Sequence, residues 1–320
     1  MATMVSRAYH IGTVGTPWTQ SEVAQWRAER VRSRSYNEEV LASLEPLKET
    51  FDVVQYGSLS YEGGIDYPVF AVKTRDWQAD KPSVLVTGGI HGYETSGVQG
   101  AILFLTGGHA AAFAAKGLNL LVVPCVSPWG YEHIQRWNPD AVDPNRSFQS
   151  RDDPSLCTSQ EAANLVSLLQ TCGVDRWACH VDLHETTDTD ETEFRLAKAA
   201  RDGLVSEPGT IPDGFHLCGD EKNPQIDFQR AVIEGVRQVT HIAPPDPDNT
   251  IIGSPVVDEG VILYDYSALG LCGGVTNAPL TTTTEVYPDS PKATDELCNL
   301  GQVAAVKSAL DFLLASTSAP

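Results

Sequence analysis

A histidine and a glutamate three residues apart, His91 and Glu94, follow directly on an apolar run at residues 83–87. The run is typical of a buried strand, and the end of that strand would deliver an imidazole and a carboxylate to one point. A catalytic zinc ion takes ligands of these two types and leaves its other positions to a distant residue and to water. The same spacing also arises by chance, so the rest of the chain must supply the remaining ligand.

A third candidate ligand, His184, follows the apolar run at residues 177–183. Asp182 and His184 share one face of the strand predicted there, because side chains alternate along a strand. A single histidine at the end of a strand is usually a hydrogen-bonded surface residue. With His91 and Glu94, however, His184 forms a set of two histidines and one carboxylate with an open fourth position, which is typical of one hydrolytic zinc ion. Asp182 either orients one of these ligands through a hydrogen bond or has a structural role.

The elements that would position these residues alternate along the chain. Strands are predicted at residues 52–56, 67–73, 83–87, 118–124 and 177–183, and helices at residues 18–33, 36–51, 95–106, 159–171, 227–240 and 295–314. This order predicts an α/β fold with a mixed, mainly parallel sheet flanked by helices on both faces. In such sheets chemistry collects at the carboxyl ends of the strands, which is where His91, Glu94 and His184 fall. With no repeat or convincing domain boundary, residues 1–320 are expected to form one domain, with residues 1–50 as a helical N-terminal decoration.

The composition excludes several classes of partner. Asp and Glu number 42 against 22 Lys and Arg, a net charge of −20, whereas nucleic acids and anionic membranes require a basic surface. Seven cysteines without a CxxC pair are expected to be buried free thiols in a reducing compartment. Residues 1–20 lack the apolar core of a signal peptide, and no apolar span of about 18 residues is evident. A cytoplasmic protein is therefore expected, although export without a leader stays open, as does the oligomeric state.

Four motifs in order resemble those of the zinc carboxypeptidase family, whose clan also contains aspartoacylase and succinylglutamate desuccinylase. They are the HxxE motif at residues 91–94, the Asp-x-Asn-Arg-x-Phe string at residues 143–148, the Asp-x-His motif ending at His184, and a threonine-rich strand ending at Glu285. The motifs span residues 91–285, so coincidence is a poor explanation. The short interval before His184 and the absence of an evident pro-segment are similar to the compact branch of the family, which is near the deacylases.

The resemblance implies a zinc-dependent hydrolase. Zinc held by His91, Glu94 and His184 would bind a water molecule, lower its pKa and polarise the carbonyl group of the bond to be cut. Glu285 matches the family's catalytic glutamate, which takes the proton of the water and hands it to the leaving amine. Arg136 matches, with a looser alignment, the arginine that stabilises the developing oxyanion.

The resemblance also implies residues that hold the substrate. Asn145 and Arg146 match the pair that binds the free carboxylate of a substrate, for which a guanidinium group is geometrically suited. Tyr264 matches the flexible tyrosine that covers bound substrate, and Tyr266 is nearly as good a candidate. The acidic cluster at residues 188–193 either lines the cleft and favours basic substrates or, in the more ordinary interpretation, is a solvated loop.

The function predicted from these observations is that of a zinc metallocarboxypeptidase, which removes the C-terminal residue of a peptide. A deacylase acting on N-acyl amino acids is the alternative, because it would use the same metal centre and the same free carboxylate. The two differ in the room they need on the acyl side, which the sequence does not disclose. A non-catalytic binding module with this fold would be expected to lack a ligand or the catalytic glutamate, whereas His91, Glu94, His184 and Glu285 are all present.

Overall fold

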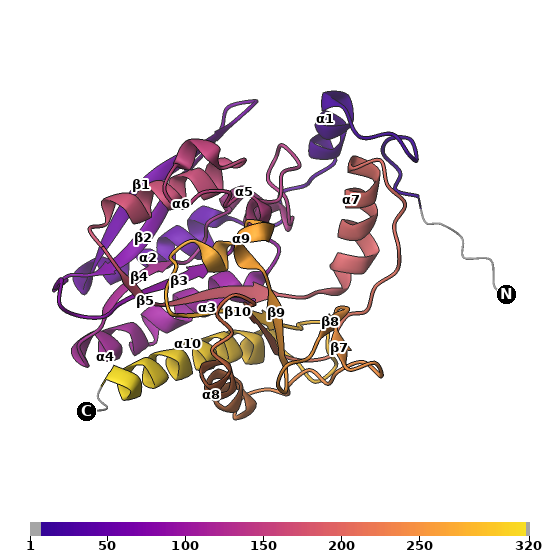
Figure 1. Cartoon of the computed structure of the whole chain (residues 1–320). Coiled ribbons are helices and arrows are strands. Elements are labelled where there is room, and N and C mark those ends of the chain that lie inside the picture. The colour runs from indigo at the N-terminus through magenta and orange to yellow at the C-terminus, as the bar shows by residue number, and fades with distance from the viewer. Residues whose placement is uncertain (1–7, 318–320) are drawn as a thin grey trace.

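An eight-stranded sheet forms the centre of the computed structural model, which describes residues 8–317 (Figure 1). The strands lie in the order β1-β2-β4-β3-β5-β10-β6-β9. Their bounds, with those of the separate hairpin β7–β8, are β1 (Phe51–Tyr61), β2 (Ile65–Thr74), β3 (Ser83–Gly88), β4 (Asn119–Val123), β5 (Trp177–Glu185), β6 (His216–Asp220), β7 (Thr250–Ile251), β8 (Ser254–Pro255), β9 (Val261–Tyr264) and β10 (Leu280–Val286). The neighbours β4, β3, β5 and β10 are parallel, whereas β2 and β6 pair with this central group in antiparallel fashion. The mixed, mainly parallel sheet confirms the predicted fold class.

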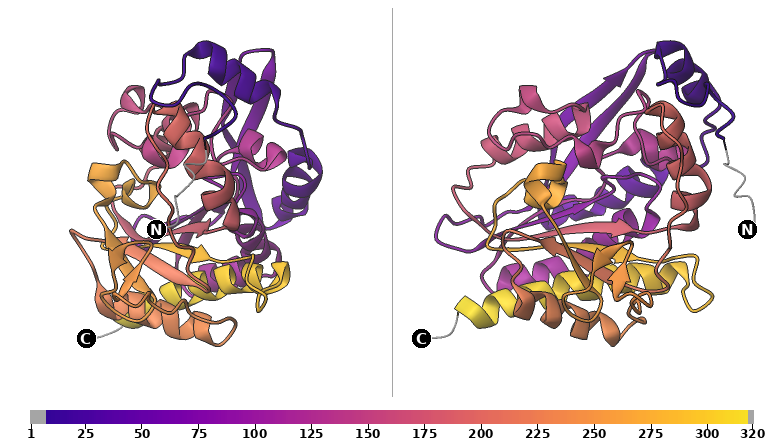
Figure 2. Two further views of the ribbon diagram at one scale, coloured as in Figure 1. Left: turned by 90° about the vertical axis from the view of Figure 1, so that its right-hand side faces the viewer. Right: turned by 45° about the vertical axis from the view of Figure 1, so that its right-hand side comes forward.

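Helices cover both faces of the sheet, as predicted (Figures 1 and 2). The helices packed on one face are α2 (Ala42–Leu44), α3 (Thr95–Thr106), α4 (His109–Ala115), α8 (Ile226–Arg237) and α10 (Asp295–Thr317). The other face carries α6 (Gln160–Thr171) and the 3₁₀-helix η6 (Cys272–Gly274). The remaining helical elements are α1 (Gln20–Ala28), α5 (Pro128–His133), α7 (Arg195–Arg201), α9 (Tyr266–Leu269), the π-helices η1 (Asn37–Leu41) and η5 (Asp190–Phe194), and the 3₁₀-helices η2 (Pro46–Glu49), η3 (Pro144–Arg146) and η4 (Pro154–Leu156).

Strand β5 shows how the two faces of the sheet differ. Val181 and Leu183 point into the larger hydrophobic cluster, where they meet residues of α3, α8 and α10. Asp182 and His184 alternate with them and therefore point to the opposite face. Every residue of the neighbouring strand β3 is buried, as predicted for a strand covered on both sides. All seven cysteines are free, also as predicted, and five of them are buried.

The sequence predicts the long elements better than the short ones. In the N-terminal region, α1, η1, α2 and η2 replace the two long helices expected at residues 18–33 and 36–51. Helix α1 begins with a capping box formed by Thr19 and Glu22 and buries Trp26 alone among its own residues, so little apolar surface supports a longer helix. The sequence does not predict α4, α5, α7, β6 and β9, because each is too short to show a clear hydrophobic period.

Helix α10 corrects the expectation that the chain has no long apolar span. By length and composition this helix is apolar enough to cross a membrane, as is the bent pair of α3 and α4 when taken together. Half of the most apolar window of α10 is buried inside the structure, where the helix packs on α3 and α8. The core helix of a soluble protein passes the same test, so the finding is weak evidence for a membrane segment.

Candidate metal centre

The turn between β3 and α3 presents His91 and Glu94 at the carboxyl edge of the sheet. Gly92 makes this turn possible, because a Cβ atom there would lie 1.9 Å from the backbone nitrogen of Tyr131. Glu94 occupies the N-cap position of α3, where the helix dipole favours a negative charge. The side chains of both candidate ligands are buried, with exposures of 2% for His91 and 1% for Glu94.

Strand β5 brings His184, which lies much later in the chain than His91 and Glu94, to the same edge of the sheet. The parallel register of β5 and β10 sets Glu285 beside His184. Gln302 of α10 fixes both strand ends, since its Nε2 donates to the carbonyl oxygen of His184 at 2.8 Å and its Oε1 accepts from Thr284 Oγ1 at 2.6 Å. The position of the third candidate ligand is thus set by the sheet and by a helix beneath it.

His91, Glu94 and His184 converge, with one ligand atom from each lying within 4.8 Å of the others. Glu94 Oε1 lies 2.7 Å from His91 Nδ1, and Glu94 Oε2 lies 2.6 Å from His184 Nδ1. Oε2 is nevertheless a buried atom without a hydrogen-bond partner in the described residues, which leaves it available to a metal ion. Burial by itself would raise the pKa of Glu94, but the two imidazoles outweigh it and lower this pKa to about 2.

Two aspartates hold the imidazole rings from behind. Asp143 Oδ1 lies 3.0 Å from His91 Nε2, and Asp182 Oδ2 lies 2.9 Å from His184 Nε2. Both rings therefore turn Nδ1 toward Glu94, in the arrangement by which outer carboxylates orient metal-ligating histidines. Two imidazole nitrogens and a carboxylate, with room for one more ligand, fit a divalent metal ion such as zinc. Asp143 opens the string at residues 143–148, but its contact with His91 is not visible in the sequence.

Arg136 places a fixed positive charge beside the candidate metal ligands. Its Nε lies 3.1 Å from Asp143 Oδ2 and its Nη1 donates to the hydroxyl of Tyr93 at 3.1 Å. The same Nη1 lies 3.8 Å from Glu94 Oε1 and 3.7 Å from Asp190 Oδ1. Arg136 therefore lies beside the candidate metal ligands. Its contact with Tyr93 is not visible in the sequence, whereas Asp190 belongs to the acidic cluster at residues 188–193.

Glu285, the last residue but one of β10, lies on the same face of the sheet as its register partner His184. Its Oε2 accepts a hydrogen bond from Thr186 Oγ1 at 2.9 Å. Burial, followed by the negative charge of Glu94, raises the pKa of Glu285 to about 8. A carboxyl group with a pKa near neutrality can both accept and return a proton, which is the chemistry of a general base.

Asn145 and Arg146 are neighbours in η3, but they differ in burial and in the contacts of their side chains. Asn145 is buried, with Oδ1 accepting from the backbone nitrogen of Cys272 at 2.8 Å and Nδ2 lying 3.3 Å from His184 Nε2. Arg146 is exposed, and its Nη1 donates to the carbonyl oxygen of Asn145 at 2.7 Å. No carboxylate in residues 8–317 forms an ion pair with Arg146. Of the two, Arg146 has a charge available to an anionic ligand.

The two candidate tyrosines occupy different environments. Tyr264, at the end of β9, is half-buried and interacts electrostatically with Arg146 and Glu285. Tyr266 has an exposure of 1%, and its hydroxyl donates to the carbonyl oxygen of Cys218. A tyrosine that moves over bound substrate must be free to turn, which favours Tyr264.

Only one member of the acidic cluster joins the site. Asp190 accepts from the hydroxyl of Tyr93 at 2.5 Å, next to Arg136. Asp188, Glu191 and Glu193 contact, respectively, Tyr287, Arg195, and the pair of Tyr9 and Arg30. The three are thus engaged away from the candidate ligands, in agreement with the more ordinary interpretation of this cluster.

Structures described as metallopeptidases or metallo-carboxypeptidases are similar to this chain. One from Shewanella denitrificans, described as a candidate metallopeptidase, has 19% sequence identity and a TM-score of 0.62 over 87% of this chain and 88% of that chain. A metallo-carboxypeptidase from Burkholderia cenocepacia has 18% identity and a TM-score of 0.56 over 88% and 69% of the two chains. A metallo-carboxypeptidase from Pseudomonas aeruginosa, solved with (2-guanidinoethylmercapto)succinic acid, has 16% identity and a TM-score of 0.55 over 87% and 69%. The likeness shows the metallocarboxypeptidase-like fold that the sequence motifs predict.

The chain belongs to the family described as Protein of unknown function (DUF2817). The family profile matches residues 63–243, which is more than half of the chain. None of the curated proteins matches the sequence significantly. The matched segment contains His91, Glu94 and His184 and ends before Tyr264 and Glu285.

Proposed function

We propose that this protein is a zinc-dependent metallocarboxypeptidase, with one zinc ion per chain, that hydrolyses the C-terminal amide bond of peptides. The observation that carries the proposal is the convergence of His91, Glu94 and His184, each with one ligand atom within 4.8 Å of the others, beside Glu285. Histidine nitrogens and a carboxylate oxygen are the ligands of hydrolytic zinc sites. Arg146 adds a cation without an ion-pair partner in the described part of the chain, which suits a substrate with a free carboxylate.

The side chains around the ligands have positions that suit hydrolysis. When bound, zinc would polarise the carbonyl group and lower the pKa of a water molecule. The Glu285 carboxylate would take a proton from the attacking water as the water oxygen bonds to the carbonyl carbon, and Arg136 would stabilise the negative charge on the carbonyl oxygen. Glu285 then passes the proton to the amide nitrogen as the C–N bond breaks. The products are a new carboxyl group and a free amino acid.

Substrate recognition is proposed to depend on the free carboxylate. The Arg146 guanidinium would bind it through paired hydrogen bonds, and Tyr264 would cover the bound residue. Asn145 would act indirectly, because its side chain is engaged with Cys272 and His184. A peptide and an N-acyl amino acid both carry such a carboxylate, so both are substrate classes for the test.

The test is a screen of the zinc-loaded protein against dipeptides, longer peptides and N-acyl amino acids that share one C-terminal residue. Release of the free amino acid is measured, and C-terminally amidated versions of the same peptides serve as controls. We expect release from the peptides with a free carboxylate and none from the amides. Release from N-acyl amino acids alone would indicate the deacylase instead, and no release from any class would contradict a hydrolytic function.

We further propose that residues 1–320 act as one catalytic domain in the cytoplasm, with residues 1–50 as its helical decoration. The net charge of −20 supports the absence of nucleic-acid and anionic membrane partners. Gel-shift and vesicle-binding assays at low ionic strength should therefore show no association.

A further inference from the structure

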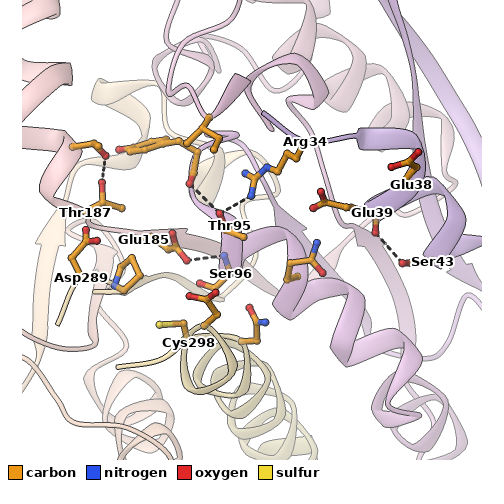
Figure 3. A pocket seen from close by; sticks show the side chains of 17 residues that line it. Arg34, Glu38, Glu39, Ser43, Thr95, Ser96, Glu185, Thr187, Asp289 and Cys298 are labelled. Carbon is orange, nitrogen blue, oxygen red and sulfur yellow. Dashed lines mark hydrogen bonds between the residues drawn. The ribbon is translucent and has the colours of Figure 1, made fainter. Parts of the chain in front are cut away.

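A cavity of about 630 Å³ lies between α3, α10 and the segment at residues 34–43 (Figure 3). Thr95 and Ser96 of α3, and Glu185 and Thr187 from the end of β5, form the wall nearest the candidate metal centre. A cavity of this volume can hold a ligand the size of a short peptide segment.

Neighbours of the metal ligands line this cavity. Tyr93 precedes Glu94, and its hydroxyl accepts a hydrogen bond from Arg136 at 3.1 Å. Glu185 follows His184 in β5 and therefore points to the opposite face of the sheet, because successive side chains alternate. The cavity thus adjoins the metal centre from the face opposite to His184 and Glu285.

The carboxylate-binding side lies on the other face. Glu285 shares the face of its register partner His184, and both Arg146 and Tyr264 interact electrostatically with Glu285. A substrate whose carboxylate rests on Arg146 and whose amide bond lies at the metal would extend its acyl portion across the sheet edge. Tyr93, which lines the cavity and contacts Arg136, marks the boundary that this portion would cross to reach the cavity.

Negative charge dominates the cavity wall. None of its five carboxylates has a basic partner within 4.0 Å in the described residues; they are Glu38, Glu39, Glu185, Asp289 and Asp295. Arg34 is the single Arg or Lys in the lining, and its guanidinium is engaged by the carbonyl oxygens of Tyr131 at 2.6 Å and Gly92 at 2.9 Å and by Thr95 Oγ1 at 2.8 Å. Charges of one sign in a concave site focus the potential and attract the opposite charge.

Glu185 is the most informative of the five. Its exposure is only 4%, and it accepts a hydrogen bond from the backbone nitrogen of Ser96 at 2.7 Å. Ser96 lies in the first turn of α3, so the N-terminal end of this helix already stabilises the carboxylate. Figure 3 shows Glu185 at the cavity together with Asp289 and Ser96. Glu185 has no basic side chain within 4.0 Å in residues 8–317, so a ligand cation at the cavity would be its first ion-pair partner.

We propose that this cavity binds an ammonium or guanidinium group on the acyl portion of the substrate, so that peptides with a positive charge upstream of the cleaved bond are preferred. The inference rests on the proposed function and extends it to the substrate class. The cation is either the free N-terminus of a short peptide or a lysine or arginine side chain.

Four tetrapeptides separate these two sources. They share the sequence X-Ala-Ala-Leu, with X as lysine or norleucine and with a free or an acetylated N-terminus. We expect the kcat/KM of the zinc-loaded protein to be at least about tenfold higher for the cationic peptides than for the acetylated norleucine peptide. Tenfold is the lower end of the rate gains that a focused electrostatic potential gives. Preference for the free norleucine peptide would assign the N-terminus, and preference for the acetylated lysine peptide would assign the side chain. Equal values for all four peptides would overturn the inference.

The double variant Glu38→Gln/Asp289→Asn tests the cavity itself. Both residues are exposed at its rim, so the fold should be kept, and their loss should reduce the preference several-fold. The matched control Glu207→Gln/Asp311→Asn changes two exposed carboxylates outside the lining and should leave the preference intact. An unchanged preference in the first variant would contradict the assignment to this cavity.

Binding gives a readout that does not depend on turnover. Isothermal titration calorimetry with the zinc-loaded Glu285→Gln protein should show tighter binding of the cationic peptides, weakened by the rim substitutions and by added salt. Equal affinities for charged and neutral peptides would overturn the cation site even if hydrolysis occurs. A charge preference in binding, together with no hydrolysis of any peptide by the unmodified zinc-loaded protein, would keep the cation site and contradict the proposed activity.

Discussion

Asp182 Oδ2 lies 2.9 Å from Nε2 of His184, which leaves Nδ1 of the same ring directed at Glu94. The aspartate is itself held by Thr87, whose Oγ1 donates to Asp182 Oδ1 at 2.6 Å. These contacts join neighbouring strands β3 and β5 beneath the candidate metal centre. These contacts favour the first of the two roles that the sequence leaves open for Asp182, which are orienting a metal ligand and a purely structural role.

Removal of the negative charge of Asp182 should weaken its contact with His184 and therefore the binding of the metal ion. In Asp182→Asn we expect the affinity for zinc to fall about 10- to 100-fold, the usual effect of removing an outer carboxylate from a ligating histidine. Competition with a chromogenic chelator measures the affinity. Asp227→Asn, an exposed carboxylate with 87% of its side chain accessible, is the matched control and should bind zinc normally. Unaltered affinity in Asp182→Asn would refute the orienting role.

Metal uptake should release protons. Burial alone would lower the pKa of His184, but Glu94 and Asp182 outweigh it and raise this pKa well above its ordinary value. The two carboxylates thus favour the protonated ring in the metal-free protein, and this ring must lose its proton to bind zinc, so affinity should fall as the pH falls, by up to about tenfold per unit. Calorimetry in two buffers of different ionisation enthalpy measures the release. No net proton release at pH 7 would contradict this account of His184.

Arg146 should bind the free carboxylate of the substrate. Arg146→Ala is expected to lower kcat/KM about 10- to 100-fold, because hydrogen bonds to a charged group contribute about 1.5–3 kcal/mol. The loss should appear mainly in KM, and the zinc content should stay the same. Arg151→Ala removes a second exposed arginine without an ion pair in the described residues and serves as the control. Kinetics equal to those of the unmodified protein would exclude Arg146 from carboxylate binding.

Acid should destabilise the fold through buried histidines. Burial lowers the pKa of His216 to about 4, whereas the unfolded chain binds the proton near pH 6.5. Between these values the unfolded state holds more protons, so stability is lost as the pH falls, by about 2 kcal/mol at pH 5 for this group. Urea unfolding of the zinc-free protein at pH 7 and pH 5 measures the change. His216→Phe should show a smaller difference, and an undiminished difference would assign the pH dependence to other groups.

The site residues at strand ends are the part of the structure that the sequence discloses best. His91, Glu94 and His184 each follow an apolar run, and parallel strands place such positions at one edge. The contacts of Gln302 with His184 and Thr284 are not visible in the sequence, because helix and strand are joined through tertiary packing alone.

The cavity is hidden from the sequence for a similar reason. Its carboxylates come from separate segments, with Glu38 near the N-terminus, Glu185 in β5 and Asp289 before α10. The sequence instead draws attention to the local cluster at residues 188–193, most of which is engaged elsewhere. Charge runs are visible along a chain, whereas a charged cavity is assembled by the fold.

The rate at which zinc-loaded Glu285→Gln releases a C-terminal amino acid tests the central claim most directly. Glutamine keeps the shape of the side chain but cannot take a proton, so we expect the rate to fall about 10²- to 10⁴-fold while one zinc ion per chain is retained. Glu207→Gln, the same chemical change at an exposed position, should leave the rate unchanged. Hydrolysis at the normal rate by zinc-loaded Glu285→Gln would contradict the account.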